Sequence, residues 1–135
     1  MRKAFTLVEV LIVVAIIGIM AAIVIPTFRG HIQQAKEAAA KDDLRILRNA
    51  IELYASQHNG VPPGYSGNKP TGLVTPLNVY NQLFFKGKYL SGLPKNPFND
   101  RQTIEVLPNG LNFPTNAAGT TGWIYQPATK TIKLD

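Results

Sequence analysis

The sequence of 135 residues contains no cysteine and little charge, and each of these absences excludes a class of function. Without cysteine, the chain has neither a disulfide framework nor a thiolate metal site. Charged side chains make up 16% of the residues, and the formal net charge of +6 comes from lysines and arginines scattered singly. Because nucleic-acid binding favours a dense basic patch with aromatic side chains, we expect a solvated basic surface and no nucleic-acid partner.

Patterns typical of catalytic sites are missing as well. The sequence shows no Ser–His–Asp set, no paired carboxylates and no phosphate-binding glycine loop. The two histidines, His31 and His58, have no Asp or Glu at metal-ligand spacing on the same helix face. We therefore expect no enzymatic activity, no cofactor and no bound metal.

The longest stretch without charge lies near the N-terminus, at residues 10–28. A helix over this span would be about 28 Å long, which is close to the hydrocarbon thickness of a bilayer. The run is apolar on every side, and Arg2 and Lys3 precede it, which predicts a membrane anchor with a cytoplasmic N-terminus. A cleaved secretory signal and a buried soluble helix are the alternatives. The signal is disfavoured because the apolar run continues beyond Ala22 and Glu9 interrupts its start.

Two residues inside this run are predicted to break or kink the helix. Pro26 lacks an N–H group and its ring clashes with the carbonyl of Ala22. Gly18 costs about 1 kcal/mol relative to alanine in a helix interior. Membrane helices tolerate both residue types, so ordinary tolerance is the alternative interpretation.

The stretch from Lys3 to Glu9, "KAFTLVE", and the apolar run after it closely resemble the N-terminus of type IV pilins and type II secretion pseudopilins. The shared features are a short basic leader, a small residue followed by Phe, and Glu four residues later. Gly18 and Pro26 also lie where this family carries them. The resemblance covers the first fifth of the chain.

The resemblance implies a processing site. A membrane-embedded prepilin peptidase would cut between Ala4 and Phe5, remove the leader formed by residues 1–4, and N-methylate the new amine of Phe5. Arg2 and Lys3 would be the leader charges on the cytoplasmic side. The family usually has glycine where this chain has Ala4.

Glu9 is the residue that the resemblance links to assembly of subunits. Phe5 and Glu9 are four residues apart, so on a helix they share one face. Cleavage would place a cationic amine within a turn of the carboxylate, and the amine of one subunit could meet Glu9 of a neighbour. Removing one partner of a buried ion pair commonly costs about 3–5 kcal/mol. Such a pair therefore favours one register between the helices of neighbouring subunits.

The chain is predicted to adopt an α+β, pilin-like fold, in which a long N-terminal helix packs on a small sheet. Residues 5–28 form the transmembrane half of one long helix and residues 29–58 its amphipathic half, which Gly60 ends. Residues 59–135 form a small globular region with a short helix and an antiparallel sheet. Apolar residues at spacings of three and four predict the stripe that packs on the sheet, namely Leu44, Leu47, Ile51 and Tyr54, widened by Ile46, Ala50 and Leu53.

Within the globular region, the patterns predict one short helix and several strands. The helix covers residues 77–84 and ends by Gly87, and residues 103–107 alternate as a strand. A turn at 108–110 could return the chain through residues 111–113. A terminal hairpin brackets residues 128–130, with Trp123 and Tyr125 as core residues and ligand binding as the alternative. The segment "YLSGLPKNPFND" is similar to one in pseudopilin-like domains.

Five residues in this region could be placed around a calcium ion, because major secretion pseudopilins carry such a site near their C-terminus: Asn96, Asn99, Asp100, Asn109 and Asp135. Calcium takes six to eight oxygen ligands, and few carboxylates are available here. The aspartate-rich pattern of those relatives is missing. We therefore do not expect calcium binding.

The resemblance implies a structural subunit of a pilus-like filament in a type II secretion system. Its partners would be copies of itself and other pilins, the prepilin peptidase and an inner-membrane assembly platform. It would start in the inner membrane and continue as a periplasmic or extracellular filament. The alternatives are a type IV pilus subunit, major or minor, and a membrane-tethered binding module that never polymerises.

Overall fold

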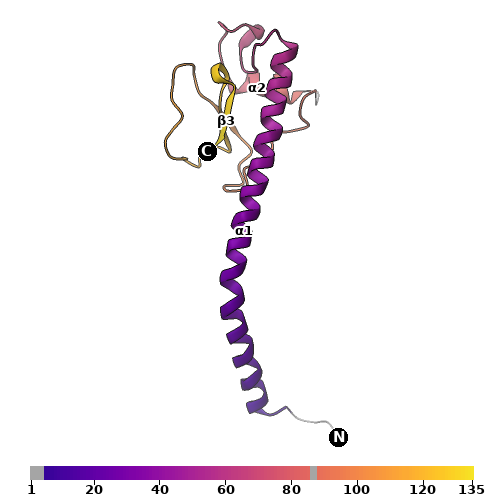
Figure 1. The fold of residues 1–135 in the computed structure, drawn as a ribbon, viewed down its shortest axis with the longest axis vertical. Helices are drawn as coiled ribbons and strands as arrows, with labels where there is room; N and C mark the ends of the chain where they lie inside the picture. The colour runs from indigo at the N-terminus through magenta and orange to yellow at the C-terminus, as the bar shows by residue number, and fades with distance from the viewer. Residues whose placement is uncertain (1–4, 86–87) are drawn as a thin grey trace. The chain divides into compact units, whose positions relative to one another are not determined.

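The computed structural model of this protein describes residues 5–85 and 88–135, apart from the side chains of residues 26, 27 and 29. The chain divides into two compact units, one up to Lys36 and one from Glu37 to Asp135. The elements follow in the order α1 (Leu7–Gln57), η1 (Ser66–Asn68), α2 (Pro76–Leu83), β1 (Ile104–Val106), β2 (Trp123–Gln126), η3 (Pro127–Thr129) and β3 (Thr131–Leu134) (Figure 1).

Helix α1 is one continuous element of 51 residues. It begins two residues later and ends one residue earlier than the sequence predicts. Its C-terminal stop is confirmed, because Gly60 has a φ of 82° and its N–H donates to the carbonyl of Ala55 at 2.8 Å. The helix continues through Gly18 and Pro26, so neither residue ends it in the single chain, and a kink or local opening there stays a prediction.

The part of α1 in the first unit has no core of its own. Its large apolar side chains are exposed, and an 18-residue window with a mean hydropathy of 3.1 has none of its residues buried. By length and composition the helix can cross a membrane. A continuous apolar surface of this kind requires lipid or other apolar helices around it.

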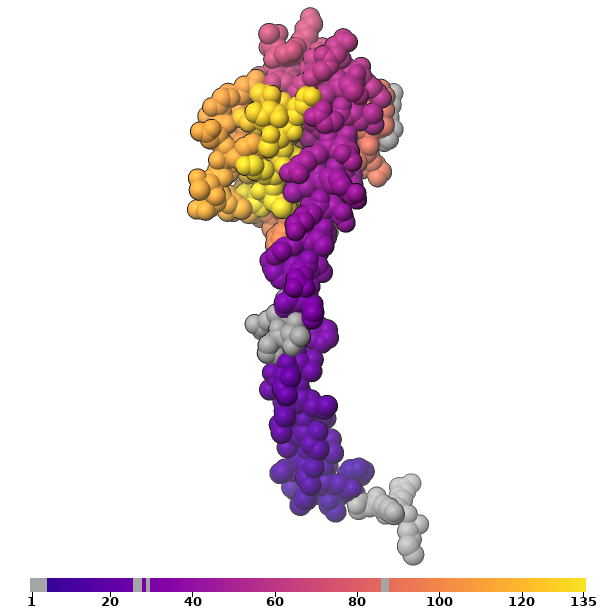
Figure 2. All heavy atoms as spheres, viewed as in Figure 1, coloured from indigo at the N-terminus to yellow at the C-terminus, as the bar shows by residue number. Residues whose placement is uncertain are grey.

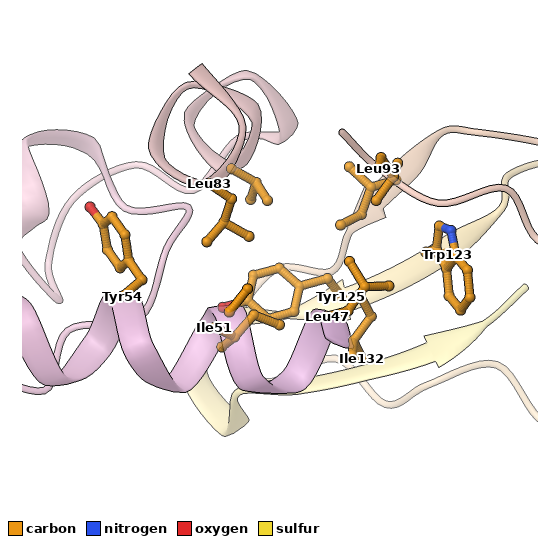
Figure 3. Close-up of a cluster of buried hydrophobic side chains, with 11 residues drawn as sticks. Leu47, Ile51, Tyr54, Leu83, Leu93, Trp123, Tyr125 and Ile132 are labelled. Atoms are coloured by element: carbon orange, nitrogen blue, oxygen red, sulfur yellow. The ribbon is translucent and has the colours of Figure 1, made fainter. Parts of the chain in front are cut away.

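The second unit has a single core to which α1, α2 and the sheet all contribute. Leu47, Ile51 and Tyr54 of α1 are at most 2% exposed and face Leu83 of α2 and the strands (Figure 3). The predicted helical stripe is therefore confirmed at its centre. Its expected widening is wrong at Ile46 and Leu53, which are 45% and 49% exposed.

The sheet has three strands in the order β1-β2-β3, and its pairing is mixed. The terminal hairpin is confirmed, since β2 and β3 are antiparallel with Trp123 opposite Leu134. The prediction of an all-antiparallel sheet is wrong, because β1 runs parallel to β2. Residues 107–122, which we call the β1–β2 connection, exceed the dozen or so residues that a parallel crossover needs. The expected return at 111–113 forms no strand.

The sheet lies between α1 and the β1–β2 connection. Figure 2 shows the last segment of the chain, in yellow, against the second half of α1, with the connection, in orange, on its other side. All four residues of β2 are buried, as expected for a strand covered on both faces. The connection is held there in part by Gln126, whose Nε2 donates to the carbonyl of Leu111 at 2.7 Å.

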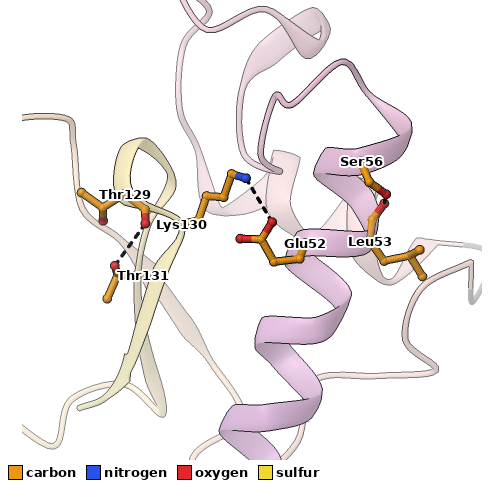
Figure 4. Close-up of polar contacts among 6 residues, drawn as sticks. All are labelled: Glu52, Leu53, Ser56, Thr129, Lys130 and Thr131. Atoms are coloured by element: carbon orange, nitrogen blue, oxygen red, sulfur yellow. Dashed lines mark hydrogen bonds and ion pairs between the residues drawn. The ribbon is translucent and has the colours of Figure 1, made fainter.

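The turn before β3 also contacts α1. Lys130 has a φ of 53° and its Nζ lies 3.0 Å from Oε2 of Glu52 (Figure 4). Because both side chains are substantially exposed, this ion pair contributes about 0.2–1 kcal/mol to the free energy of unfolding.

Candidate functional site

The N-terminal end of α1 is organised by a reciprocal cap between Thr6 and Glu9. The backbone N–H of Glu9 donates to Oγ1 of Thr6 at 3.3 Å, while the N–H and hydroxyl of Thr6 donate to Oε2 of Glu9 at 3.4 and 3.3 Å. This arrangement is a capping box, which satisfies N–H groups that the first helical turn leaves unpaired. Thr6 was missed at the sequence level, although Thr-x-x-Glu before an apolar run is the signal for it.

The predicted processing residues lie at the edge of the described chain. Phe5 is 77% exposed and precedes the first helical residue, Leu7. Phe5 lies outside the helix in the uncleaved chain, so the shared helix face of Phe5 and Glu9 stays a prediction for the processed subunit. Ala4 and the leader charges Arg2 and Lys3 lie outside the described residues.

Glu9 lies beside an apolar surface. Leu7, Val10, Leu11 and Val14 line this surface at the start of the helix, and the large side chains here are half or more exposed. A carboxylate next to such a surface is stable in a membrane or in a bundle of helices only when a cation or hydrogen-bond donors neutralise it. Thr6 supplies some of those donors in the single chain.

Gly18 has no contact in the single chain that requires a glycine. A Cβ atom built on it would meet nothing within 4 Å. Close packing at this position therefore has to come from outside the chain, as small residues allow between membrane helices.

The structure brings together three of the five residues considered for calcium. Asn96, Asn99 and Asp135 converge, because the side-chain Nδ2 atoms of both asparagines donate to the main-chain oxygen of Asp135, at 3.2 and 3.3 Å. Asn109 lies elsewhere and pairs with the hydroxyl of Tyr65. Asp100 is exposed.

These residues do not fit a calcium ion, because Asp135 supplies the only carboxylate among the three that converge and its oxygens are occupied by hydrogen-bond donors. Oδ1 of Asn96 accepts from the N–H of Phe98 at 2.9 Å, and Oδ1 of Asn99 accepts from the N–H of Arg101 at 3.0 Å. The Asp135 carboxylate accepts from backbone and hydroxyl donors of residues 118–121. Within residues 5–85 and 88–135, no group of three His, Asp or Glu side chains could hold a metal.

Trp123 and Tyr125 are core residues, as predicted. Both are 0% exposed. The indole Nε1 of Trp123 donates to the carbonyl of Pro94 at 2.8 Å, and the hydroxyl of Tyr125 donates to the carbonyl of Pro63 at 3.1 Å. Burial raises the pKa of Tyr125 far above its ordinary value. Neither ring is accessible to a ligand.

The fold and the N-terminal site together define a class of protein. An exposed apolar helix that by length and composition can cross a membrane continues into a small α+β unit, where its second part packs against a three-stranded sheet. This is the architecture of a membrane-anchored structural subunit of the pilin type.

Comparison with known proteins identifies the family. The family model "Prokaryotic N-terminal methylation motif" matches residues 1–25. Type II secretion system core protein G of Vibrio cholerae is 33% identical over 89% of each chain, and its Pseudomonas aeruginosa counterpart is 34% identical over 73% of this chain and 70% of its own. Type IV major pilin protein PilE1 of Neisseria gonorrhoeae is 28% identical over 96% of this chain and 61% of its own. No solved structure matches.

The chain belongs to the family of type II secretion system core protein G, the pseudopilins. Membership confirms the resemblance to this family, the pilin-like α+β fold and the expectation of a structural protein that is not an enzyme. It also connects the exposed N-terminal helix with an anchor in the inner membrane.

Proposed function

We propose that this chain is the repeating subunit of a pilus-like filament in a type II secretion system. It enters the inner membrane with its N-terminus in the cytoplasm, is cut between Ala4 and Phe5, and joins copies of itself through its N-terminal helix. The observation that carries the proposal is the 33% identity to core protein G over 89% of both chains. The type IV pilin PilE1 is 28% identical, which is lower than the 33% and 34% identity of the Vibrio cholerae and Pseudomonas aeruginosa proteins, and this supports secretion over the pilus alternative.

Glu9 has two successive partners in this proposal. In the single chain its carboxylate caps the helix through Thr6. After cleavage and N-methylation, the amine of Phe5 is a cation, and in a staggered filament the amine of one subunit meets Glu9 of the next. Because an unpaired buried charge is costly, this ion pair selects one register between neighbouring helices.

The remaining partners follow from the same proposal. The prepilin peptidase acts on the Ala4–Phe5 bond, and an inner-membrane assembly platform adds subunits to the filament, with other pilins as further partners. The exposed apolar part of α1 supplies the contact surface between subunits once it leaves the lipid. Gly18 and Pro26 permit local opening of α1 in the filament, although the helix is continuous in the single chain.

Substitutions that separate the two roles of Glu9 test the proposal. Glu9→Gln keeps the capping box, which accepts Gln at this position, but removes the charge. Thr6→Ala removes the cap and keeps the charge. We expect Glu9→Gln and Glu9→Ala to be inserted and cleaved normally but to lower the yield of sheared filaments at least about tenfold, the factor for 1.4 kcal/mol. Thr6→Ala should lower it much less.

Glu105→Gln is the matched control, because Glu105 is an exposed carboxylate on β1 of the globular unit. It should leave filament yield unchanged. A normal yield from Glu9→Gln would refute the ion pair. A membrane-bound Phe5-started monomer that never enters sheared fibres would instead favour the tethered binding module.

Mass spectrometry of the native N-terminus tests the processing step directly. The proposal expects a chain that starts at Phe5 and carries one methyl group on its amine. An intact residue 1–4 segment on filament subunits would refute cleavage at this bond. Deleting the gene and measuring exported enzymes and surface motility separates the secretion system from a type IV pilus.

A further inference from the structure

The β1–β2 connection is hydrogen-bonded to the side-chain carboxylate of Asp135. Oδ1 of Asp135 accepts from the N–H groups of Ala118 at 2.8 Å and Gly119 at 3.3 Å. Oδ2 accepts from the N–H of Thr121 at 2.7 Å, its hydroxyl at 3.0 Å, and the hydroxyl of Thr120 at 3.2 Å. Five donors from four consecutive residues therefore converge on a side chain whose residue is 5% exposed.

Two asparagines extend this cluster to a third segment. Nδ2 of Asn96 donates to the carbonyl of Gly122 at 2.9 Å, and Nδ2 of Asn99 donates to the carbonyl of Thr121 at 2.7 Å. Both also donate to the main-chain oxygen of Asp135. The segments 96–99, 118–122 and 135 are thus joined by hydrogen bonds in which Asp135 supplies the only charged side chain.

A divalent cation and these donors compete for the same oxygens. A carboxylate has about four lone-pair sites, and five donors already point at that of Asp135. The side-chain oxygens of Asn96 and Asn99 accept backbone N–H groups. A cation would have to displace N–H dipoles that are oriented to stabilise negative charge.

We infer that the Asp135 carboxylate is the centre around which residues 118–121 fold, and that it holds the β1–β2 connection in place without a divalent cation such as calcium. The negative charge of this side chain is neutralised by N–H and O–H dipoles of the chain itself. This inference goes beyond the proposed function, because it concerns the fold of each subunit and is measured without any filament.

Thermal unfolding of the full chain in detergent micelles tests the inference. Trp123 is the single tryptophan and lies directly after the connection, so its fluorescence reports unfolding there. We expect the same Tm in excess EGTA and in millimolar CaCl2, and no saturable heat on titration with CaCl2. A Tm that rises with CaCl2, or saturable binding, would overturn the inference.

The variant Asp135→Asn tests whether the Asp135 carboxylate stabilises the β1–β2 connection. Asp100→Asn is the matched control, because Asp100 is an exposed carboxylate. The amide introduced at position 135 would set its own N–H donors against those of the connection. We expect Asp135→Asn to lower the Tm by about 5–10 °C equally in EGTA and in CaCl2, and Asp100→Asn to change nothing.

Hydrogen exchange gives a local readout. The amides of Ala118, Gly119 and Thr121 should exchange about tenfold faster in Asp135→Asn than in the native chain. If that variant does not fold, Thr121→Val is the substitute, because it removes only one hydroxyl donor. It should speed the exchange of the same amides by a smaller factor. Unchanged exchange in a folded variant, or a destabilisation seen only with calcium present, would contradict the assignment.

Discussion

Asn96 shows how buried polar side chains order the globular unit. It is 0% exposed, and its amide makes hydrogen bonds from both ends, to Gly122 and Asp135 through Nδ2 and from Phe98 through Oδ1. An apolar residue of the same size would remove the hydrogen-bond partner of three main-chain groups, namely the oxygens of Gly122 and Asp135 and the N–H of Phe98. Among the described residues that are not exposed, no buried side-chain nitrogen or oxygen lacks a partner. The arrangement is therefore specified by hydrogen bonds as well as by packing.

Gly122 lies close to the backbone that leads into β1. A Cβ atom at this position would come within 2.5 Å of the carbonyl oxygen of Arg101, which is backbone and has little room to move. Gly122 also accepts from Asn96 and from the N–H of Asp135. A side chain at position 122 would therefore push against the backbone at Arg101 and Thr103, next to the residue whose carbonyl accepts from Asn96 and Asp135.

The stability of the globular unit should fall in strong acid through Asp135. Burial raises the pKa of this carboxyl, but hydrogen bonds from Thr121, Ala118 and Gly119 outweigh it and lower the pKa from 3.8 to about 2. Because the folded pKa lies below the unfolded one, the stabilisation is complete above about pH 4 and is lost as the pH falls towards 2.

Melting temperatures of the native chain and of Asp135→Asn, measured between about pH 2 and pH 6, check this expectation. The native Tm should drop more steeply than that of the variant below about pH 4, so that the two curves converge. The donors on the carboxylate are uncharged, so added salt should leave the difference in place. Parallel curves through this range would contradict the assigned titration.

Residue 4 is expected to control processing through its size. Ala4→Gly restores the residue that the family usually carries, so the precursor should be cut at least as fast as the native one. Ala4→Arg should block cutting, because a bulky charge replaces the small residue before the bond. The shift from precursor to mature protein on a gel measures both, and equal rates for all three chains would remove Ala4 from the recognition site.

At the scale of elements, α1 has different surroundings along its length. In the first unit its large apolar side chains are exposed on all sides, whereas in the second unit only one stripe is buried. Ile51 belongs to that stripe at 1% exposure, and Leu53, two residues later, lies on the exposed side at 49%. The helical period of 3.6 residues separates them by about 200° around the axis.

Ile51→Ala and Leu53→Ala therefore form a matched pair. Ile51→Ala removes buried methyl groups from the core, and we expect it to lower the free energy of unfolding by about 2–5 kcal/mol. Leu53→Ala should change that free energy by no more than about 0.5 kcal/mol. Denaturant unfolding followed by Trp123 fluorescence measures both, and equal losses would show that α1 buries a different face.

At the scale of the whole molecule, the two units need different environments. The globular unit buries its own core, whereas the large apolar side chains described before Phe28 are exposed within their unit. Lipid and the helices of other subunits are the two apolar environments that the proposed function supplies. Passage from one to the other keeps this surface away from water throughout assembly.

The full chain should accordingly behave as an integral membrane protein before assembly. We expect it to remain in the membrane pellet after alkaline carbonate extraction and to enter solution only with detergent, because its 18-residue window has a mean hydropathy of 3.1. Ile17→Lys, in the middle of the charge-free run, should shift the chain towards the carbonate extract, since a lysine at the helix centre costs about 2.5–3.5 kcal/mol. Complete extraction of the native chain would contradict the anchor.

The sequence by itself determined the features that depend on neighbouring residues. The charge-free run, the stripe through Leu47 and Ile51, and the hairpin of β2 and β3 each follow a period or a turn within a short segment, and the structure contains all three. Only the tertiary structure decided the parallel pairing of β1 with β2 and the burial of Asp135 against residues 118–121. The strand pairing and the Asp135 contacts both join residues at least 14 positions apart. Packing and hydrogen bonding over the whole unit decide which distant segments pair, and no pattern of neighbouring residues predicts that choice.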